Sequence, residues 1–260
     1  MRLSLFGPID RWRAPAPLPG KVAWIGEHEF AHRGLHSAGT PENSPTAFSQ
    51  AISNGLGIEC DIQRSSDGQA MVFHDWELDR LTNESGAVAQ RSAAELAQIE
   101  LAGSQDRIPT LRNLLEAVAG RVPLLIEIKS HDKMRISALC LAVRRALEGY
   151  RGSHAVMSFD PRVSRWFCDN APQIVRGLVM TEEGARTLSG SARRRLALWH
   201  ARPDFLAYDI SDLPSRFAAT QRARGLPVAT WTVRSAEQRV LAREYADAPI
   251  AEGAGAGPPR

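Results

Sequence analysis

The stretch Ile58-Glu59-Cys60-Asp61-Ile62 alternates two acids with apolar residues over five positions. Successive side chains of a strand point to opposite faces, so Glu59 and Asp61 share one face while Cys60 lies on the other. The apolar neighbours indicate a buried strand, and a strand with one solvated face is the alternative. Two acids on a buried face are costly unless a cation or fixed donors compensate them. The pattern therefore predicts a strand that presents charged groups to a ligand.

A second stretch, Leu124-Leu125-Ile126-Glu127-Ile128-Lys129, repeats this pattern after three aliphatic residues. Glu127 and Lys129 share one face of the predicted strand. A buried ion pair between these two residues is the simpler interpretation of the stretch taken alone. Considered together with the first strand, Glu127 offers a third carboxylate from the next strand of the predicted barrel.

Short apolar segments alternate with helical stretches along the whole chain. Eight of them are predicted strands: Phe30–His32, Gly57–Asp61, Leu124–Ile128, Ala155–Ser158, Val175–Val179, Phe205–Tyr208, Val228–Thr232 and Ala248–Ala251. Helix starts are recognisable between them, as at Ser44, which precedes a first-turn proline. Eight buried strands with connecting helices predict an α/β fold, a (β/α)8 TIM barrel. A doubly wound open sheet is the alternative, but no GxGxxG motif follows the first strand.

The interval from Asp61 to Leu124 is far longer than an ordinary connection between a strand and a helix. It contains a predicted extra strand at Met71–His74 and a predicted helix at Ala93–Leu101. We therefore expect a small insertion after the second strand. The expected organisation is an N-terminal arm at 1–20, a barrel domain at 21–251 with its insertion at about 62–110, and a flexible tail at 252–260.

Composition excludes several classes of protein. Of the 260 residues, 43% are hydrophobic and 23% are charged, which is typical of a folded globular protein. No apolar run approaches the roughly 18 residues of a membrane-spanning helix, and the N-terminus lacks the apolar core of a signal peptide, so we expect a cytoplasmic protein. Cys60, Cys140 and Cys168 form no CxxC pair, which argues against a zinc cluster or a disulfide framework. The net charge of +3 comes from scattered basic residues, so we expect no nucleic-acid partner.

The acidic residues point to a metal site. Both acidic stretches end predicted parallel strands, and the carboxyl ends of barrel strands carry the active sites of this architecture. Oxygen ligands without a cysteine or histidine cluster suit Mg²⁺ or Ca²⁺ better than Zn²⁺. The expected ligands are Glu59, Asp61 and Glu127, and Lys129 faces the same cavity, where it can meet an anion.

Two histidines end predicted strands, His32 in Phe30-Ala31-His32-Arg33-Gly34 and His74 in Met71-Val72-Phe73-His74-Asp75. A lone histidine at such a place is more often structural. Here both are expected at the rim that holds the acids, where two imidazoles can divide general acid and general base work. Arg33 offers a forked donor for phosphate.

The order and spacing of these motifs resemble those of one enzyme family, the glycerophosphodiester phosphodiesterases. The similarity covers about Phe30 to Ile250. Its strongest parts are His32-Arg33-Gly34, Pro41-Glu42-Asn43-Ser44, Glu59-Cys60-Asp61, His74-Asp75 and Glu127-Ile128-Lys129. Softer matches are Leu78-Asp79-Arg80-Leu81-Thr82, Ile108-Pro109-Thr110-Leu111, Ser158-Phe159-Asp160-Pro161 and Thr230-Trp231-Thr232-Val233.

The resemblance implies a (β/α)8 barrel with a small insertion after its second strand, and metal-dependent hydrolysis of glycerophosphodiesters to glycerol 3-phosphate and an alcohol. By the same resemblance, the metal ligands are Glu59, Asp61 and Glu127, the acid and base are His32 and His74, and the phosphate contacts are Arg33 and Lys129. Glu42 matches a position near the metal, Asn43 is expected to organise its loop, and Trp231 matches a position at the glycerol side of the pocket. By analogy, His32 is the base and His74 is the acid, and the reverse assignment stays open. Whether water or the adjacent glycerol hydroxyl attacks phosphorus also stays open.

Two alternatives accompany this interpretation. Related barrels act on lysophospholipids or sphingolipids at membranes, and Leu3, Leu5, Phe6 and Trp12 give the arm a modest apolar set. A non-catalytic phosphodiester-binding module is the other alternative, although none of the expected catalytic residues is missing. The expected partner is a small-molecule glycerophosphodiester, with no stable membrane insertion and with the oligomeric state open. The segment Ala248–Glu252 departs from the family's pattern at the last strand.

Overall fold

The computed structural model describes residues 6–131 and 134–256 of the chain. The chain divides into two compact units. The first unit joins the N-terminal segment up to Glu29 to Ala155–Gly255, and the second unit is built on Phe30–His154. Leu3 and Leu5 of the predicted arm and the last four residues of the predicted tail lie outside the described residues. The predicted boundaries of arm, barrel and tail stay predictions.

Nine strands lie within the described part of the chain. They are β1 (Phe30–Ala31), β2 (Gly57–Arg64), β3 (Ala70–Val72), β4 (Leu124–Ile128), β5 (His154–Ser158), β6 (Val175–Met180), β7 (Phe205–Asp209), β8 (Val228–Val233) and β9 (Ala248–Ala251). Their order is β1-β9-β8-β7-β6-β5-β4-β2-β3, and β1 also pairs with β2. Eight strands therefore close into a ring, while β3 is bonded outside it. The predicted (β/α)8 barrel with an insertion after its second strand is confirmed.

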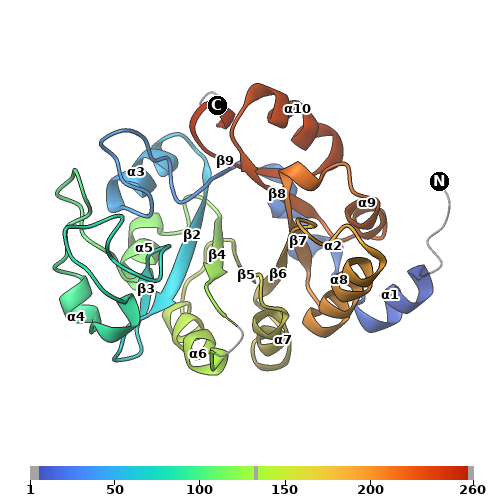
Figure 1. Cartoon of the computed structure of the whole chain (residues 1–260), viewed down its shortest axis with the longest axis horizontal. Helices are drawn as coiled ribbons and strands as arrows, with labels where there is room; N and C mark the ends of the chain where they lie inside the picture. Colours follow the sequence, from blue (N-terminus) through green and yellow to red (C-terminus); the bar gives the residue numbers. More distant parts are fainter. Residues whose placement is uncertain (1–5, 132–133, 257–260) are drawn as a thin grey trace. The chain divides into compact units, whose positions relative to one another are not determined.

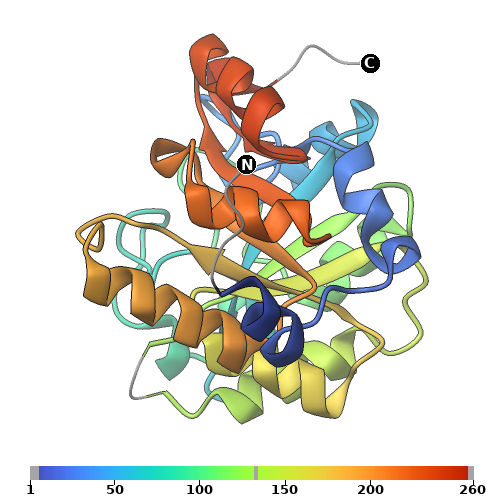
Figure 2. The same ribbon diagram turned by 90° about the vertical axis from the view of Figure 1, so that its right-hand side faces the viewer.

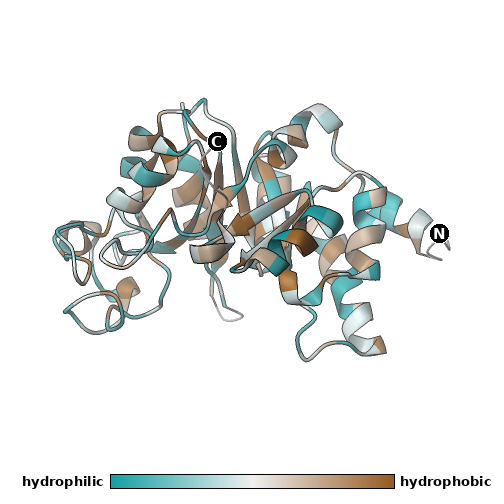
Figure 3. Ribbon diagram, turned by 90° about the horizontal axis from the view of Figure 1, so that it is seen from above, coloured by the Kyte–Doolittle hydropathy of each residue, from teal (hydrophilic) through white to brown (hydrophobic). Residues whose placement is uncertain are grey.

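The first helices precede β1, and the later helices lie between strands. They are α1 (Gly7–Arg13), α2 (Pro19–Val22), α3 (Pro45–Ser53), α4 (Ala93–Leu96), α5 (Leu111–Val118), α6 (Ile136–Ala146), α7 (Pro161–Asn170), α8 (Leu188–Ala201), α9 (Arg216–Ala223) and α10 (Ala236–Tyr245), with short 3₁₀ turns η1 (Ala23–Glu27), η2 (Val88–Gln90), η3 (Ile210–Asp212) and η4 (Gly253–Gly255). Ser44 caps α3 as predicted, because its hydroxyl accepts from the Ala47 amide at 3.1 Å. Hydrophilic and hydrophobic residues alternate along the helices (Figure 3), as expected for helices with one face packed on a sheet.

In the second unit, β1, β2 and β4 are parallel neighbours, and β2 and β4 run side by side in Figure 1. The register places Ala31 beside Ile58 and Asp61 beside Glu127. All five residues of β4 and the first seven of β2 are buried. Both strands are therefore nearly continuous apolar segments, and the acidic residues within them are buried inside the protein.

The insertion after β2 has its own small hydrophobic core. Its buried members are Met71, Phe73, Leu78, Val88, Leu96, Ile99, Leu101 and Ile108. The predicted strand at Met71–His74 is β3, which pairs antiparallel with β2 and ends at Val72. The predicted helix at Ala93–Leu101 is wrong beyond Leu96. Its later residues leave the helix because the Leu101 amide donates to the Asp106 carbonyl at 2.7 Å, which closes a turn instead.

In the first unit, β5 to β9 form successive parallel pairs. The predicted arm contains a helix, α1, which packs against α8 (Figure 2). The fully buried Asp10 fixes this packing, because its carboxylate accepts from the Trp199 indole at 2.8 Å and from the Gln221 amide at 3.2 Å. Among the described helices, none has the length and apolar character needed to cross a membrane.

Candidate active site

Three carboxylates from β2 and β4 come together inside the second unit. Glu59 and Asp61 are each only 2% exposed, and Glu127 is 9% exposed. Because Asp61 lies beside Glu127 in the parallel register, both strands send their acids to one place. One oxygen from each carboxylate lies within 4.8 Å of the others. The predicted juxtaposition of Glu59, Asp61 and Glu127 is confirmed as geometry.

The electrostatics of this cluster favour a cation. Burial raises the pKa of Glu59 well above its ordinary value, and the charges of Asp61 and Glu127 raise it further. Burial and the charge of Asp61 raise the pKa of Glu127 to about 6 although Lys129 opposes the shift. Three buried acids whose charges repel one another are compensated by a cation placed between their oxygens. A donor set made only of carboxylate oxygens fits a hard divalent ion.

Two cationic side chains flank the acids. The Arg33 amide donates to Glu59 Oε2 at 3.0 Å, and Arg33 Nε lies 3.3 Å from Asp61 Oδ2. Lys129 Nζ lies 3.2 Å from Glu127 Oε1 and 3.5 Å from Asp61 Oδ1. Burial opposes both positive charges, yet the surrounding carboxylates raise the pKa of Arg33 and of Lys129. Both predicted phosphate-contacting residues therefore stay charged beside the acids.

The backbone turns sharply where Arg33 leaves β1. Arg33 has a φ of 56°, and Gly34 follows it with a φ of 80°. This left-handed turn lets the Arg33 amide reach Glu59 while its guanidinium Nη1 donates to Glu42 Oε1 at 2.6 Å. Glu42, predicted near the metal, is placed by the structure on Arg33 and on Arg80.

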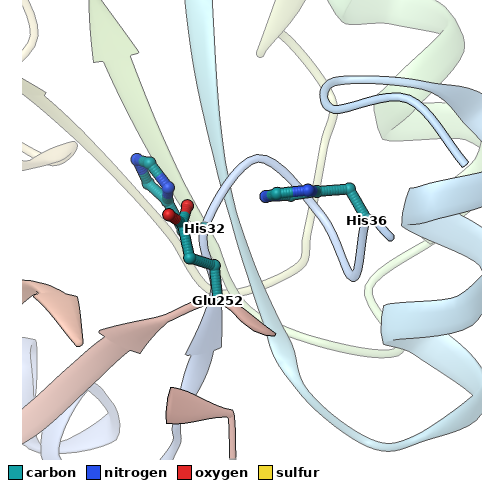
Figure 4. A group of neighbouring side chains, drawn as sticks. All are labelled: His32, His36 and Glu252. Atoms are coloured by element: carbon teal, nitrogen blue, oxygen red, sulfur yellow. The ribbon is translucent and has the colours of Figure 1, made fainter. Parts of the chain in front are cut away.

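His32 directly follows β1 and lies beside the carboxylate cluster. Its Nε2 is 3.9 Å from Glu59 Oε2. His36, further along the same turn, has a ring nitrogen within 4.8 Å of one of His32, and both rings are drawn in Figure 4. Glu252, also drawn there, belongs to the first unit. The structure thus places the predicted histidine His32 at the edge of the acidic site.

His74 follows β3 and is held from two directions. Its Nδ1 lies 2.6 Å from Asp75 Oδ1. The side-chain amide of Gln63 donates to the carbonyls of Phe73 at 3.2 Å and of His74 at 3.1 Å, and also to that of Asp75. Burial lowers the pKa of His74, and the hydrogen bond to Asp75 opposes this shift. The Phe73 amide donates to the Asp61 carbonyl at 3.0 Å, which ties this segment to β2, the strand that carries Glu59 and Asp61.

Two site residues were not predicted with these contacts. Asn43 was expected to organise its loop, but its side chain also donates to Asp61 Oδ2 at 3.0 Å and accepts from the Asp61 amide. Gln63 was missed because the predicted strand ended at Asp61, whereas β2 continues to Arg64. Alternation along the longer strand would have placed Gln63 on the face of the two acids.

Trp231 lies on β8 in the first unit. Its indole donates to the Ala207 carbonyl at 2.9 Å, and its ring packs edge-on against the Phe159 ring with 5.3 Å between the ring centroids. Phe159 is half exposed. The predicted contact of Trp231 with the glycerol part of a substrate stays a prediction.

Comparison with known proteins identifies relatives of the chain. The model of the glycerophosphoryl diester phosphodiesterase family matches residues 32–251. A glycerophosphodiester phosphodiesterase of Caldanaerobacter subterraneus is 39% identical over 110 residues, which are 39% of this chain and 44% of that protein. Glycerophosphodiester phosphodiesterase 1 of Rattus norvegicus is 32% identical over 176 residues, 63% of this chain and 51% of that protein. The chain therefore spans about half the length of these curated relatives.

Solved structures share the fold. A phosphodiesterase of Oleispira antarctica, solved in complex with the product sn-glycerol-3-phosphate, has a TM-score of 0.75 and 24% identity. The match covers 86% of this chain and 92% of that one. A glycerophosphodiester phosphodiesterase of Thermotoga maritima has a TM-score of 0.68 and 25% identity, over 85% of this chain and 92% of that one.

Proposed function

This chain belongs to the glycerophosphoryl diester phosphodiesterase family, which matches residues 32–251, and from this premise we propose that it hydrolyses glycerophosphodiesters to glycerol 3-phosphate and an alcohol. The observation that carries the proposal is the buried cluster of Glu59, Asp61 and Glu127 with Arg33 and Lys129 against it. Acids alone would repel a phosphodiester, whereas a cation and two fixed positive side chains make the same place attractive to it.

Glu59, Asp61 and Glu127 are the residues that would hold one divalent cation, Mg²⁺ or Ca²⁺. The fit is supported by the raised pKa values of Glu59 and Glu127, which burial and the neighbouring carboxylates cause and which a cation between the oxygens would oppose. When bound, such an ion supplies charge neutralisation at the phosphate and activation of a hydroxyl. Asn43 keeps the Asp61 carboxylate in place through its side-chain amide.

The two histidines move the protons. In the proposed reaction the His32 imidazole removes a proton from the attacking oxygen, which belongs to water or to the adjacent glycerol hydroxyl. The other imidazole, on His74, gives a proton to the departing alkoxide from Nε2, because Nδ1 is held by Asp75. This division of roles follows the family analogy, and exchange of the two roles is the alternative.

Arg33 and Lys129 bind the phosphate oxygens. Both side chains are mostly buried and lie against carboxylates, so they are oriented before a substrate arrives. Fixed positive groups of this kind stabilise the charge that develops on phosphorus without reorganising during the reaction. Arg33 offers its forked guanidinium, and Lys129 acts as a point charge.

The test is incubation of the Mg²⁺- or Ca²⁺-loaded chain with glycerophosphocholine and related head-group esters. We expect equal amounts of glycerol 3-phosphate and free alcohol. Release of glycerol with a phosphorylated alcohol, or no turnover with either ion, would contradict the proposal. A parallel assay with a lysophospholipid, with and without liposomes, tests the alternative of a lipid phosphodiesterase at a membrane surface.

A further inference from the structure

The segment after His74 joins this histidine to Arg33 through a chain of charged groups. Asp75 contacts His74, Arg80 contacts Asp75, and Arg80 also contacts Glu42, which in turn contacts Arg33. We propose that Asp75 and Arg80 are positioning residues that fix the His74 imidazole for proton delivery to the leaving alcohol. The inference rests on the proposed function, since it concerns one proton transfer of that reaction.

Asp75 fixes which nitrogen of His74 faces the substrate. A carboxylate only accepts hydrogen bonds, so at 2.6 Å from Asp75 Oδ1 the Nδ1 of His74 is the donor. This contact leaves Nε2 as the nitrogen that can carry a proton to another molecule. The contact with Asp75 also restrains the side-chain torsions of His74, and Gln63 fixes the backbone of His74 through its carbonyl.

Arg80 in turn fixes the Asp75 carboxylate. Its Nε lies 2.5 Å from Asp75 Oδ2, and its Nη2 lies 2.9 Å from Asp75 Oδ1. Two parallel bonds of this kind orient a carboxylate in its own plane as well as in distance. The hydrogen bonds from Arg80 also hold the pKa of Asp75 well below its usual range. The acceptor that His74 uses is therefore both oriented and ionised.

The backbone on both sides of Arg80 is anchored. Leu78 is fully buried in the hydrophobic core of the insertion, and Leu81 packs against that core. The same guanidinium reaches Glu42 Oε1 at 2.8 Å and Glu42 Oε2 at 3.1 Å. Because the Arg80 guanidinium binds two carboxylates and its backbone is anchored, its side chain has little freedom to move. The insertion therefore contributes to the proposed site, because it carries Arg80, which orients the Asp75 carboxylate that holds His74.

The chemistry makes this role separable from a merely structural one. In the cleavage step the attacking oxygen, of water or of the adjacent glycerol hydroxyl, forms a bond to phosphorus and gives its proton to His32. The bond between phosphorus and the leaving oxygen breaks, its electron pair stays on that oxygen, and the His74 Nε2 proton transfers to it. A choline alkoxide needs this proton, whereas p-nitrophenolate is stable without it. Loss of His74 positioning therefore slows release of an alcohol far more than release of p-nitrophenol.

The experiment compares glycerophosphocholine with the p-nitrophenyl ester of glycerol 3-phosphate, using Asp75→Ala, Arg80→Ala and Arg80→Lys. For both alanine variants, kcat on the choline ester is expected to fall about 10-fold or more, while KM stays within about twofold and kcat on the p-nitrophenyl ester falls less than about threefold. Arg80→Lys is expected to be intermediate, because an ammonium cannot fork onto both carboxylates. Arg91→Ala is the matched control, since Arg91 lies in the same insertion and pairs with Glu84 instead.

Equal losses on both esters, or a change confined to KM, would overturn the positioning role. A wild-type protein that cleaves neither ester would contradict the proposed function itself, and the inference with it. A second readout needs no turnover: nitrogen NMR of the metal-free protein above the pKa of His74 is expected to show the proton on Nδ1 in wild type and on Nε2 in Asp75→Ala. The same tautomer in both proteins would contradict the proposed contact.

Discussion

Replacing Glu127 with glutamine is expected to change how the stability of the metal-free protein depends on pH. Burial and Asp61 raise the pKa of Glu127 from 4.5 to about 6. Because the folded value is the higher one, the neutral carboxyl favours the folded state. That contribution is fully present below pH 4.5 and is lost as the pH rises through about 6. The difference corresponds to about 2 kcal/mol, of which about 1 kcal/mol is lost between pH 5 and pH 8.

The assay is urea unfolding in the presence of a chelator at pH 5 and at pH 8. The free energy of unfolding of Glu127→Gln, relative to wild type, is expected to increase by about 1 kcal/mol from the lower to the higher pH. The pairing of Glu127 with Lys129 is already contained in the folded pKa of about 6, because Lys129 opposes the upward shift. Removal of the charge also relieves Glu59, which adds to the change in the same direction.

Added metal is expected to stabilise wild type more than the Glu127→Gln variant. At a hundred times the dissociation constant, Mg²⁺ or Ca²⁺ is expected to stabilise wild type by about 2.7 kcal/mol and the variant much less. Glu116→Gln, on the exposed side of α5, is the control and follows wild type in both experiments. An unchanged or decreasing difference between Glu127→Gln and wild type as the pH rises would refute the reasoning about buried, mutually repelling acids.

Four further substitutions test the site and the residues that hold it. His32→Ala and His74→Ala are each expected to abolish glycerol 3-phosphate release in a coupled assay while circular dichroism stays unchanged, and near-normal turnover in either would refute the proton-transfer roles. Gln63→Leu removes an amide that bonds the carbonyls of Phe73 and His74, so a loss of about 1–3 kcal/mol in urea unfolding and a reduced kcat are expected; unchanged values would show that these bonds do not hold His74. Gly34→Ala is expected to destabilise by more than about 1 kcal/mol in the same unfolding assay, because a Cβ would meet that of Ala47 at 2.9 Å and the φ is 80°; an unaltered midpoint would argue against a tight turn after β1.

The fold was predictable because its strands are short, buried and regularly separated by helices. Acids at alternate positions of an apolar strand predicted both the strand and the face they share, and the register of β2 and β4 places Asp61 beside Glu127 as that prediction required. The end of α4 was not predictable from local pattern. The apolar residues after Leu96 fit a helical pattern, but in the structure the helix ends there and the chain forms a turn between Leu101 and Asp106 instead.

The site was predictable where its residues lie in strands and less so in the turns. Arg80 lies outside any helix or strand, and its partner Glu42 is 38 residues away in the sequence. No periodicity connects two such positions, so only the folded insertion brings them together. The contact of Asn43 with Asp61 spans 18 residues and depends on a left-handed backbone at Asn43, with a φ of 56°. Sequence pattern predicts neither contact.

The most direct measurement is glycerol 3-phosphate release from glycerophosphocholine by chelator-treated wild type and Glu59→Gln, before and after each divalent ion is restored. Wild type is predicted to release no glycerol 3-phosphate without metal and to regain activity with Mg²⁺ or Ca²⁺. The variant is predicted to release none under any of these conditions. Full turnover by the stripped wild type, or recovery of the variant to wild-type rates, would contradict a cation held by the buried acids as the centre of this active site.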